Sequence, residues 1–209
     1  MKIATVIPAF NEEQTVGGVV RVVRSVPELN EVIVVCDGCT DSTAEVAQQE
    51  GATVVVLPEN RGKGAAMLVG AAQTSAEIVI FIDADLIGLR PQHLLALAQP
   101  VLSGTADMTV GIFANGRLAT DLAQLVAPYL SGQRGLRKAL ISQIDNMEVV
   151  RYGIEVALTN YARRNGWRVQ NVELADLTHI MKEEKLGLVK GFGARMKMYW
   201  EIAKCLTQW

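Results

Sequence analysis

The sequence has few of the residues that mark specialised classes of protein. Three cysteines and two histidines occur among 209 residues, and aromatic residues make up 5% of the chain. The cysteines, Cys36, Cys39 and Cys205, are too few and too unevenly spaced to staple a secreted domain with disulfides. Their scarcity favours a protein of a reducing cytoplasm.

Long hydrophobic runs and an excess of one charge are also missing. No window approaches the roughly 20 apolar residues of a membrane-spanning helix, and Met1–Pro8 lacks the apolar stretch of a signal peptide. The formal net charge of −2 gives no overall attraction to nucleic acid or anionic lipid. We therefore expect a cytoplasmic protein with no transmembrane segment and no nucleic-acid partner, in which a local site must hold any anionic ligand.

Half of the residues are apolar, which is enough to bury a substantial core in one domain. In the first half, short β-branched runs alternate with segments of helical spacing. Strands are predicted at Lys2–Ile7, Glu31–Cys36, Ala52–Leu57 and Glu77–Ile82, and helices at Glu12–Ser25, Asp41–Glu50 and Gly64–Thr74. This alternation builds βαβ units, so the sequence predicts an α/β fold whose mostly parallel sheet is flanked by helices.

The second half is less regular. Helices are predicted at Arg117–Leu130, Glu148–Arg164 and Phe192–Leu206, and a strand at Arg168–Val172. His93 is interpreted as a residue on a helix surface. We expect residues 1–209 to form a single domain that ends in a C-terminal helical extension.

Acidic residues gather where the predicted strands end, at the edge where parallel α/β sheets bind ligands. Asp83 and Asp85 follow the fourth strand, and residues two apart in an extended segment face the same way. Two ionised carboxylates side by side need a nearby cation. Hard oxygen ligands suit Mg²⁺ or Mn²⁺, which can bridge a diphosphate. For an isolated Asp-x-Asp, helix capping or a solvated turn would be the simpler interpretation.

Two neighbouring loops strengthen the hypothesis of a metal and diphosphate site. Asp37 and Asp41 end the second strand, and Lys63 lies in a glycine-rich segment after the third, where it can meet a phosphate. Neither a P-loop nor a dinucleotide-binding Gly-x-Gly-x-x-Gly occurs in these loops. Cys36 and Cys39 have the spacing of a redox motif or half a zinc site, but no second pair exists to complete a zinc tetrahedron.

Taken in order, these segments resemble glycosyltransferase family 2, within the nucleotide-sugar transferases of the GT-A fold. The matching segments are Val6–Glu13, Asp37–Thr43, Asn60–Ala66 and Asp83–Asp85. The resemblance implies a Rossmann-like GT-A domain that acts as a hexosyltransferase, with a nucleoside-diphosphate sugar as donor, a UDP-sugar being favoured, and Mg²⁺ or Mn²⁺ as cofactor. It makes residues 1–90 the nucleotide-sugar-binding half and residues 91–209 the acceptor-binding half.

Downstream segments resemble a narrower group, the glucosyl-3-phosphoglycerate synthases. These segments are Gly116–Leu118, Leu130–Arg134 and Tyr152–Glu155. The resemblance implies that Gly116 and Arg117 bind a small anionic acceptor such as a phosphoglycerate. Ala119 and Gln133 depart from the group's pattern, which has threonine and glutamate there, so the acceptor could be another small anion.

The resemblance also implies roles for single residues. Lys63 would lie by the diphosphate and Asp83 near the ribose, while Asp85 and His179 would hold the metal, for which imidazole suits Mn²⁺ better than Mg²⁺. The nucleoside pocket would be lined by Pro8, Phe10, Glu12 and Asp37. For Pro8 and Phe10, packing at a strand end is the alternative.

Two catalytic routes stay open. An inverting transfer needs a carboxylate to accept the acceptor's proton, for which Glu155 and Glu148 are candidates. The resemblance to retaining glucosyl-3-phosphoglycerate synthases favours retention, in which the leaving diphosphate can itself assist. Asp85, Lys63 and Glu155 are therefore the candidate catalytic residues.

The C-terminal segment does not decide whether the protein has a membrane or a second copy of itself as partner. Its basic residues, which lie among methionines and aromatic residues, are Lys182, Lys185, Lys190, Arg195 and Lys197. One hypothesis is a helix peripheral to the membrane that meets a polyprenyl-phosphate acceptor; another is a helix packed on the domain or in a homodimer. A nucleotidyltransferase and a non-catalytic nucleotide-sugar-binding protein are further hypotheses, although Pro8–Glu13 lacks the glycine-rich loop of the former.

Overall fold

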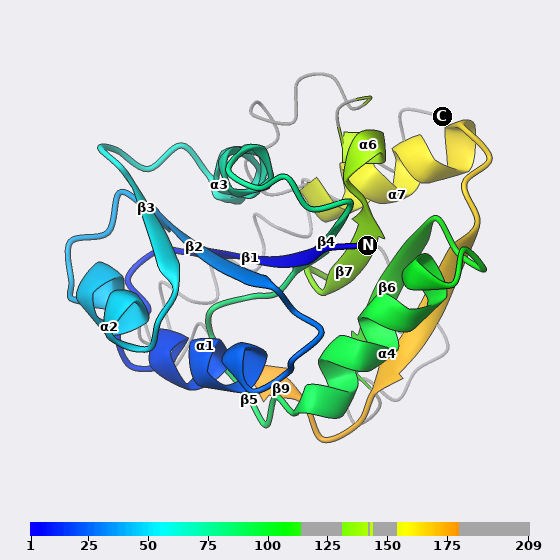
Figure 1. Ribbon diagram of the computed structural model, residues 1–209. Helices are drawn as coiled ribbons and strands as arrows, with labels where there is room; N and C mark the ends of the chain where they lie inside the picture. Colours follow the sequence, from blue (N-terminus) through cyan, green and yellow to red (C-terminus); the bar gives the residue numbers. More distant parts are fainter. Residues whose placement is uncertain (114–130, 142, 144–153, 180–209) are drawn as a thin grey trace, which may run out of the picture.

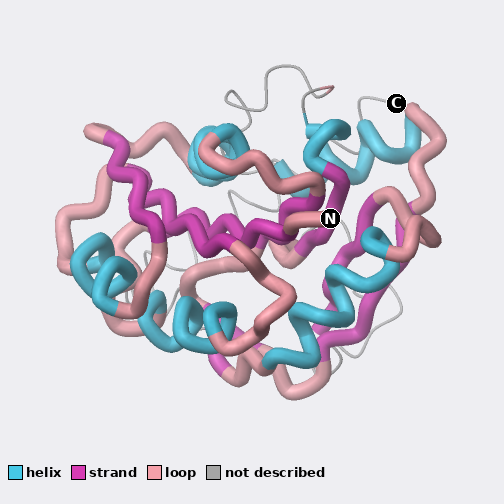
Figure 2. Tube along the Cα trace, viewed as in Figure 1, coloured by secondary structure: helices cyan, strands magenta, loops and turns pink. Residues whose placement is uncertain are grey.

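A central sheet runs through the molecule with helices on both faces (Figures 1 and 2). The computed structural model describes residues 1–113, 131–141, 143 and 154–179. Within these residues the sheet has seven strands in the order β3-β2-β1-β4-β7-β6-β8. The strands are β1 (Ile3–Ala9), β2 (Glu31–Asp37), β3 (Thr53–Leu57), β4 (Ile78–Phe81), β6 (Met108–Phe113), β7 (Arg134–Arg137) and β8 (Val169–Leu174).

The sheet is mostly parallel, as predicted. β1 pairs in parallel with β2 and β4, β2 with β3, and β6 with β8. β7 is the exception, because it lies antiparallel between β4 and β6. A second, two-stranded antiparallel sheet joins β5 (Leu86–Ile87) to β9 (Thr178–His179).

Each face of the sheet has its own hydrophobic core. Side chains alternate along a strand, so Ile3 and Ile7 of β1 pack towards one set of helices and Val6 towards the other. The first set is α1 (Val16–Arg24), α2 (Thr43–Gln49) and α4 (Pro91–Leu102), and the second is α3 (Lys63–Ala72), α6 (Lys138–Ile141) and α7 (Ile154–Arg164), as Figure 1 shows. On β4, Val79 and Phe81 face the second set.

The four strands and three helices predicted in the first half are confirmed, with shifted ends. α1 begins four residues later than predicted because Glu12–Thr15 forms a turn, in which the Thr15 and Val16 amides donate to the Glu12 carbonyl. The predicted strand at 168–172 corresponds to β8, and the described part of the predicted 148–164 helix is α7. The helices predicted at 117–130 and 192–206 lie outside the described residues.

The interpretation of His93 as a surface residue is wrong. His93 lies on α4, but only 3% of it is exposed, and its Nδ1 accepts a hydrogen bond of 3.2 Å from the Arg90 amide. Burial lowers its pKa below the usual histidine value. The histidine therefore helps to start α4 from inside the core.

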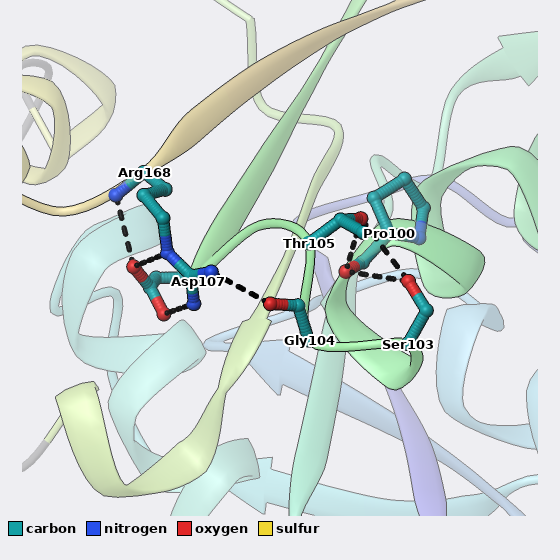
Figure 3. A network of polar contacts seen from close by, with 6 residues as sticks. All are labelled: Pro100, Ser103, Gly104, Thr105, Asp107 and Arg168. Atoms are coloured by element: carbon teal, nitrogen blue, oxygen red, sulfur yellow. Dashed lines mark hydrogen bonds and ion pairs between the residues drawn. The ribbon is translucent and has the colours of Figure 1, made fainter.

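An ion pair ties the starts of β6 and β8 together (Figure 3). Arg168 Nη2 lies 2.8 Å from Asp107 Oδ1, and the Arg168 backbone amide donates to Asp107 Oδ2 over 2.9 Å. Arg168 Nη1 also donates to the Gly104 carbonyl at 2.7 Å. The hydrogen bonds from Arg168 lower the pKa of Asp107 to about 2. β8, an edge strand of the described sheet, is thus fixed at its beginning.

No helix in the described part of the chain is long and apolar enough to cross a bilayer.

Candidate active site

The loops that follow β1 and β2 are joined by reciprocal hydrogen bonds. The Glu12 amide donates to Thr43 Oγ1 at 2.8 Å, and the Glu13 amide donates to Asp41 Oδ2 at 3.2 Å. In return, the Ser42 amide donates to Glu13 Oε2 at 3.0 Å. Burial alone would raise the pKa of Asp41, but hydrogen bonds from Thr43 and Glu13 outweigh it, so the pKa lies below its usual value. These two loops form one continuous rim beyond the strands.

The residues predicted to line a nucleoside pocket lie along this rim. Pro8 is buried within β1, whereas Phe10 is 48% exposed just beyond its end. Asp37 is almost fully buried, with 3% exposed. Its carboxylate accepts hydrogen bonds from the backbone amides of Arg61, at 2.7 Å, and Gly62, at 2.8 Å. Asp37 therefore fixes the loop that leads into Lys63, the first residue of α3.

Lys63, Asp83 and Glu155 meet at the carboxyl end of β4. Lys63 Nζ lies 2.6 Å from Asp83 Oδ1 and 2.6 Å from Glu155 Oε1. The three side chains are 30%, 25% and 11% exposed in the same order. Burial on its own lowers the pKa of Lys63, but the two carboxylates more than offset this, and the pKa lies above the usual lysine range. The lysine is therefore a permanent cation, open to solvent on one side.

The segment that leads into β7 packs directly against this ion-pair cluster. Gln133 Nε2 donates to Asp83 Oδ2 at 3.2 Å. A Cβ at Gly132 would lie 2.7 Å from Asp83 Oδ1 and in collision with Lys63 Nζ, so the ends of these side chains would have to move to admit it. Sequence reasoning treated Gln133 only as a departure from a pattern and gave Gly132 no role. The signal that could have found them is their position within the matching segment 130–134.

Arg134, the first residue of β7, is a site residue that sequence reasoning missed. Its side chain is fully buried. Nε donates to the Ser131 carbonyl and Nη2 to Thr159 Oγ1, each over 2.9 Å. Burial lowers the pKa of Arg134 to about 10, against the opposing influence of Glu155, so the guanidinium is still charged at neutral pH.

The two predicted metal ligands lie on adjacent stretches of backbone. Asp83 and Asp85 are partly exposed while Ala84 between them is buried, as expected for side chains that share one face. Leu86, which follows Asp85, pairs with His179 in the β5–β9 sheet. One or two protein ligands fit Mg²⁺ or Mn²⁺ at an open site, where phosphate oxygens and water complete the coordination.

Other parts of the predicted site are not seen. Within the described residues, no group of three or more histidine, cysteine or acidic side chains could hold a metal. Gly116 and Arg117, the predicted acceptor residues, and Glu148 lie outside the residues that the structure describes.

The cysteine pair does not have the properties of a redox centre. Cys36 is fully buried and Cys39 partly buried, and both are free thiols. Burial, followed by the influence of Cys39, raises the pKa of Cys36 to about 12. Reactive cysteines instead have lowered pKa values.

An open, mostly parallel sheet with acids beyond β4 and a lysine facing them is typical of the GT-A nucleotide-sugar transferases, whose fold this chain shares. The chain belongs to glycosyl transferase family 2, whose family model matches residues 5–162.

Among curated relatives, the chain is similar to glucosyl-3-phosphoglycerate synthase from Mycobacterium tuberculosis. The two are 31% identical over 194 residues, an alignment that covers 75% of this chain and 59% of that protein. The chain thus spans less than two thirds of the relative's length. It also matches an undecaprenyl-phosphate 4-deoxy-4-formamido-L-arabinose transferase from Pseudomonas paraeruginosa, 36% identical over 94 residues, which covers 40% of this chain and 28% of that protein.

Solved structures show the same likeness. A crystal structure of the Mycobacterium tuberculosis glucosyl-3-phosphoglycerate synthase in complex with Mn²⁺, UDP-glucose and phosphoglyceric acid superposes with a TM-score of 0.78 at 27% identity. The match covers 99% of this chain and 79% of that one. Another structure of the same enzyme holds Mg²⁺ and UDP, with a TM-score of 0.71 at 28% identity.

Proposed function

We propose that this protein transfers a hexose from a UDP-sugar to a small anionic acceptor of the phosphoglycerate kind, with Mg²⁺ or Mn²⁺ as cofactor. The observation that carries the proposal is that Lys63, Asp83 and Glu155 meet beyond the end of β4. Asp83 lies two positions before Asp85 in the sequence. The similarity to an enzyme crystallised with Mn²⁺, UDP-glucose and phosphoglyceric acid supports the donor and acceptor classes.

Residues 1–90 supply the donor site in this proposal. Phe10, Glu12 and Asp37 lie along the rim beyond β1 and β2, where the uridine would bind, with Asp83 near the ribose. The partly exposed ammonium of Lys63 would offset the charge of the diphosphate, as a compact point charge does in other phosphate sites.

Asp85 and His179 would hold the divalent ion. Bound there, the ion would neutralise the negative charge that builds on the diphosphate as the sugar leaves. The backbone pairing of Leu86 with His179 supports this assignment, since it brings His179 beside the residue that directly follows Asp85.

Residues 91–209 would receive the acceptor, through Gly116 and Arg117. In the transfer, the bond from the sugar's anomeric carbon to the diphosphate breaks, a bond to the acceptor's hydroxyl oxygen forms, and the hydroxyl proton leaves. Glu155 already bonds to Lys63 at 2.6 Å and is 11% exposed, which makes it a counter-ion for the lysine rather than a free base. We infer that the leaving diphosphate takes the proton, which is the retaining route.

A direct assay tests the proposal. The purified chain is incubated with UDP-glucose, Mn²⁺ and 3-phosphoglycerate, and the product is identified by mass spectrometry and its anomeric configuration by NMR. The expected product is a glucosyl phosphoglycerate with retained configuration, and chelation of the metal should abolish it. Tight binding of UDP without any divalent metal, or no transfer to any small anion, would refute the proposal.

A second acceptor class follows from the match to the undecaprenyl-phosphate sugar transferase. A parallel reaction with a short polyprenyl phosphate in detergent micelles separates the two classes, because only one acceptor should gain sugar. Hydrolysis of UDP-glucose without an acceptor would exclude a purely binding role, whereas donor binding without any turnover would support one. The proposed homodimer contact falls on C-terminal residues outside the described part.

A further inference from the structure

Among the described residues, Arg134 supplies the charge that balances the cluster around Lys63. Lys63 faces two carboxylates, those of Asp83 and Glu155, at 2.6 Å each. The lysine alone leaves this cluster with one excess negative charge in a largely buried place. Arg134, fully buried and electrostatically linked to Glu155, supplies the second positive charge.

Arg134 also connects the two backbone segments that shape the cluster. On one side, Nε donates to the carbonyl of Ser131, at the start of the segment whose Gly132 packs on Lys63 and Asp83. On the other side, Nη2 donates to Thr159 Oγ1, which itself donates to the backbone carbonyl of Glu155 one turn earlier in α7. The guanidinium therefore holds both walls of the ion-pair cluster.

We propose that Arg134 is a positioning residue of the donor site: its charge balances Glu155 and its hydrogen bonds fix residues 131–133, so that Lys63 stays over Asp83 with its ammonium available to the diphosphate. This inference rests on the proposed function, because it names the residue that prepares Lys63 for the donor. Arg134 is buried and acts through Glu155 and Lys63.

The charge of Arg134 matters here as well as its shape. A buried cation is costly, and packing alone is served as well or better by an apolar side chain of similar volume. Removal of one member of a buried charge group leaves its partner uncompensated. Without Arg134, Glu155 and Asp83 would compete for the single ammonium of Lys63 and hold it more firmly, leaving less of its charge for a phosphate.

A charge-compensation cycle tests this role. The variants are Arg134→Met, Arg134→Lys, Glu155→Gln and the double variant Arg134→Met/Glu155→Gln. The readouts are the Kd of UDP with Mn²⁺ by calorimetry, the KM for UDP-glucose against kcat, and ligand-free urea unfolding. Arg168→Met serves as the matched control, since Arg168 makes a comparable set of hydrogen bonds away from the site.

We expect Arg134→Met to weaken UDP binding about tenfold, the scale of coupling between residues in one charge network. KM for the donor should rise more than kcat falls, and Arg134→Lys should lose less. In the Glu155→Gln background, Arg134→Met should cost much less UDP affinity than it costs in the wild type, because the charge that Arg134 balances is then absent. A merely structural arginine would cost the same in both backgrounds. Wild-type UDP affinity in a folded Arg134→Met variant, or an equal cost in the two backgrounds, would overturn the inference.

The ligand-free unfolding measurements test the role of Arg134 even if the proposed function is wrong. If the wild-type chain binds no UDP, the proposed function fails, and Arg134 is judged on ligand-free stability. There, the double variant must again recover stability that Arg134→Met loses, and additive losses would refute the charge balance. If Arg134→Met does not fold, folding of the double variant supports the inference. If neither folds, Arg134→Lys decides: UDP affinity close to that of the wild type supports the role of the charge, and a loss of about tenfold or more in a folded Arg134→Lys variant contradicts it.

Discussion

Lys63 owes its position to residues from four separate parts of the chain. Asp37 holds the loop before it, Asp83 and Glu155 bind its ammonium, and Gly132 closes over it. If a diphosphate binds there as proposed, such a lysine would lose little further freedom, since its side chain is already ordered. Preorganisation of this kind raises affinity by lowering the cost of binding.

Replacement of Lys63 by methionine, which keeps a long unbranched side chain, should therefore act mainly on the donor. We expect UDP affinity with Mn²⁺ to fall by about tenfold or more, the worth of a charge-assisted contact to phosphate. Calorimetric titration measures it.

The control for Lys63→Met is Arg21→Met. It removes another cation with a carboxylate partner, Glu50, but at an exposed position on α1. UDP affinity should stay at the wild-type level in this variant. Equal losses in both variants would mean that general electrostatics, and no specific contact, govern binding.

Gly132→Ala tests the close packing of the 131–133 segment. The added Cβ would lie 2.7 Å from Asp83 Oδ1 and against Lys63 Nζ, so the ends of these two side chains must move apart, at a cost of about 1 kcal/mol, the lower end for an overpacked site. Urea unfolding and UDP titration should both show the loss.

Gly18→Ala is the matched control for Gly132→Ala, because nothing lies within 4 Å of a Cβ at this exposed helical position. Alanine there should stabilise the protein by about 0.5–1 kcal/mol, the helix preference over glycine. If Gly132→Ala were equally harmless, residues 131–133 would not be in tight contact with the site.

Residue types and spacing could predict part of this site. Asp83, Asp85 and Lys63 were expected at strand ends because parallel strands bring their carboxyl ends to one edge. The buried role of Arg134 could not be predicted, since arginine is almost never fully buried unless paired, and its partners lie on other elements. Which carboxylate would reach Lys63 was equally hidden, because Glu155 lies 92 positions further along the chain.

At the scale of elements, the regular βαβ half was predicted. In the less regular half, β8 and the described part of α7 were predicted, whereas α4 and β7 were not. α4 gives a weak helical pattern, because PQHLLALAQPVL is apolar on most sides and contains Pro100. β7 reads RGLR, which has no strand signature. Its neighbours β4 and β6 supply the hydrogen bonds that make it a strand, so tertiary context overrides local propensity there.

The stability that the Asp107–Arg168 ion pair gives to the start of β8 should depend on pH. The pKa of Asp107, about 2 in the folded protein, lies below the value of about 3.9 expected when unfolded. The ion pair therefore stabilises the fold above about pH 4, and this contribution is lost as the pH falls towards about 2. Because Arg168 is more than half exposed, we expect only about 0.2–1 kcal/mol.

Asp107→Asn should remove that contribution. Urea unfolding at pH 7 should show the variant to be less stable than the wild type, and the difference should shrink between pH 4.5 and 2.5. A difference that stays constant over this range would show that the pair does not titrate with the fold.

For the whole molecule, donor binding should appear as thermal stabilisation. A ligand that binds only the native state at 100 times its Kd adds about 2.7 kcal/mol. UDP with Mn²⁺ should raise the melting temperature by several degrees, and chelation of the metal should cancel the shift. A panel of nucleoside diphosphates would identify the base, and an equal shift with each of them would contradict a specific nucleoside pocket.

The position of β7 in the middle of the sheet links the completion of the sheet to the completion of the candidate site. β7 enters between β4 and β6, and the residues just before it, Gly132 and Gln133, are those that contact Lys63 and Asp83. Until that strand docks, β4 has an unpaired edge and the lysine lacks its cover. Under the proposed function, we therefore expect a chain in which β7 has not docked to hold the donor less firmly than the fully folded protein.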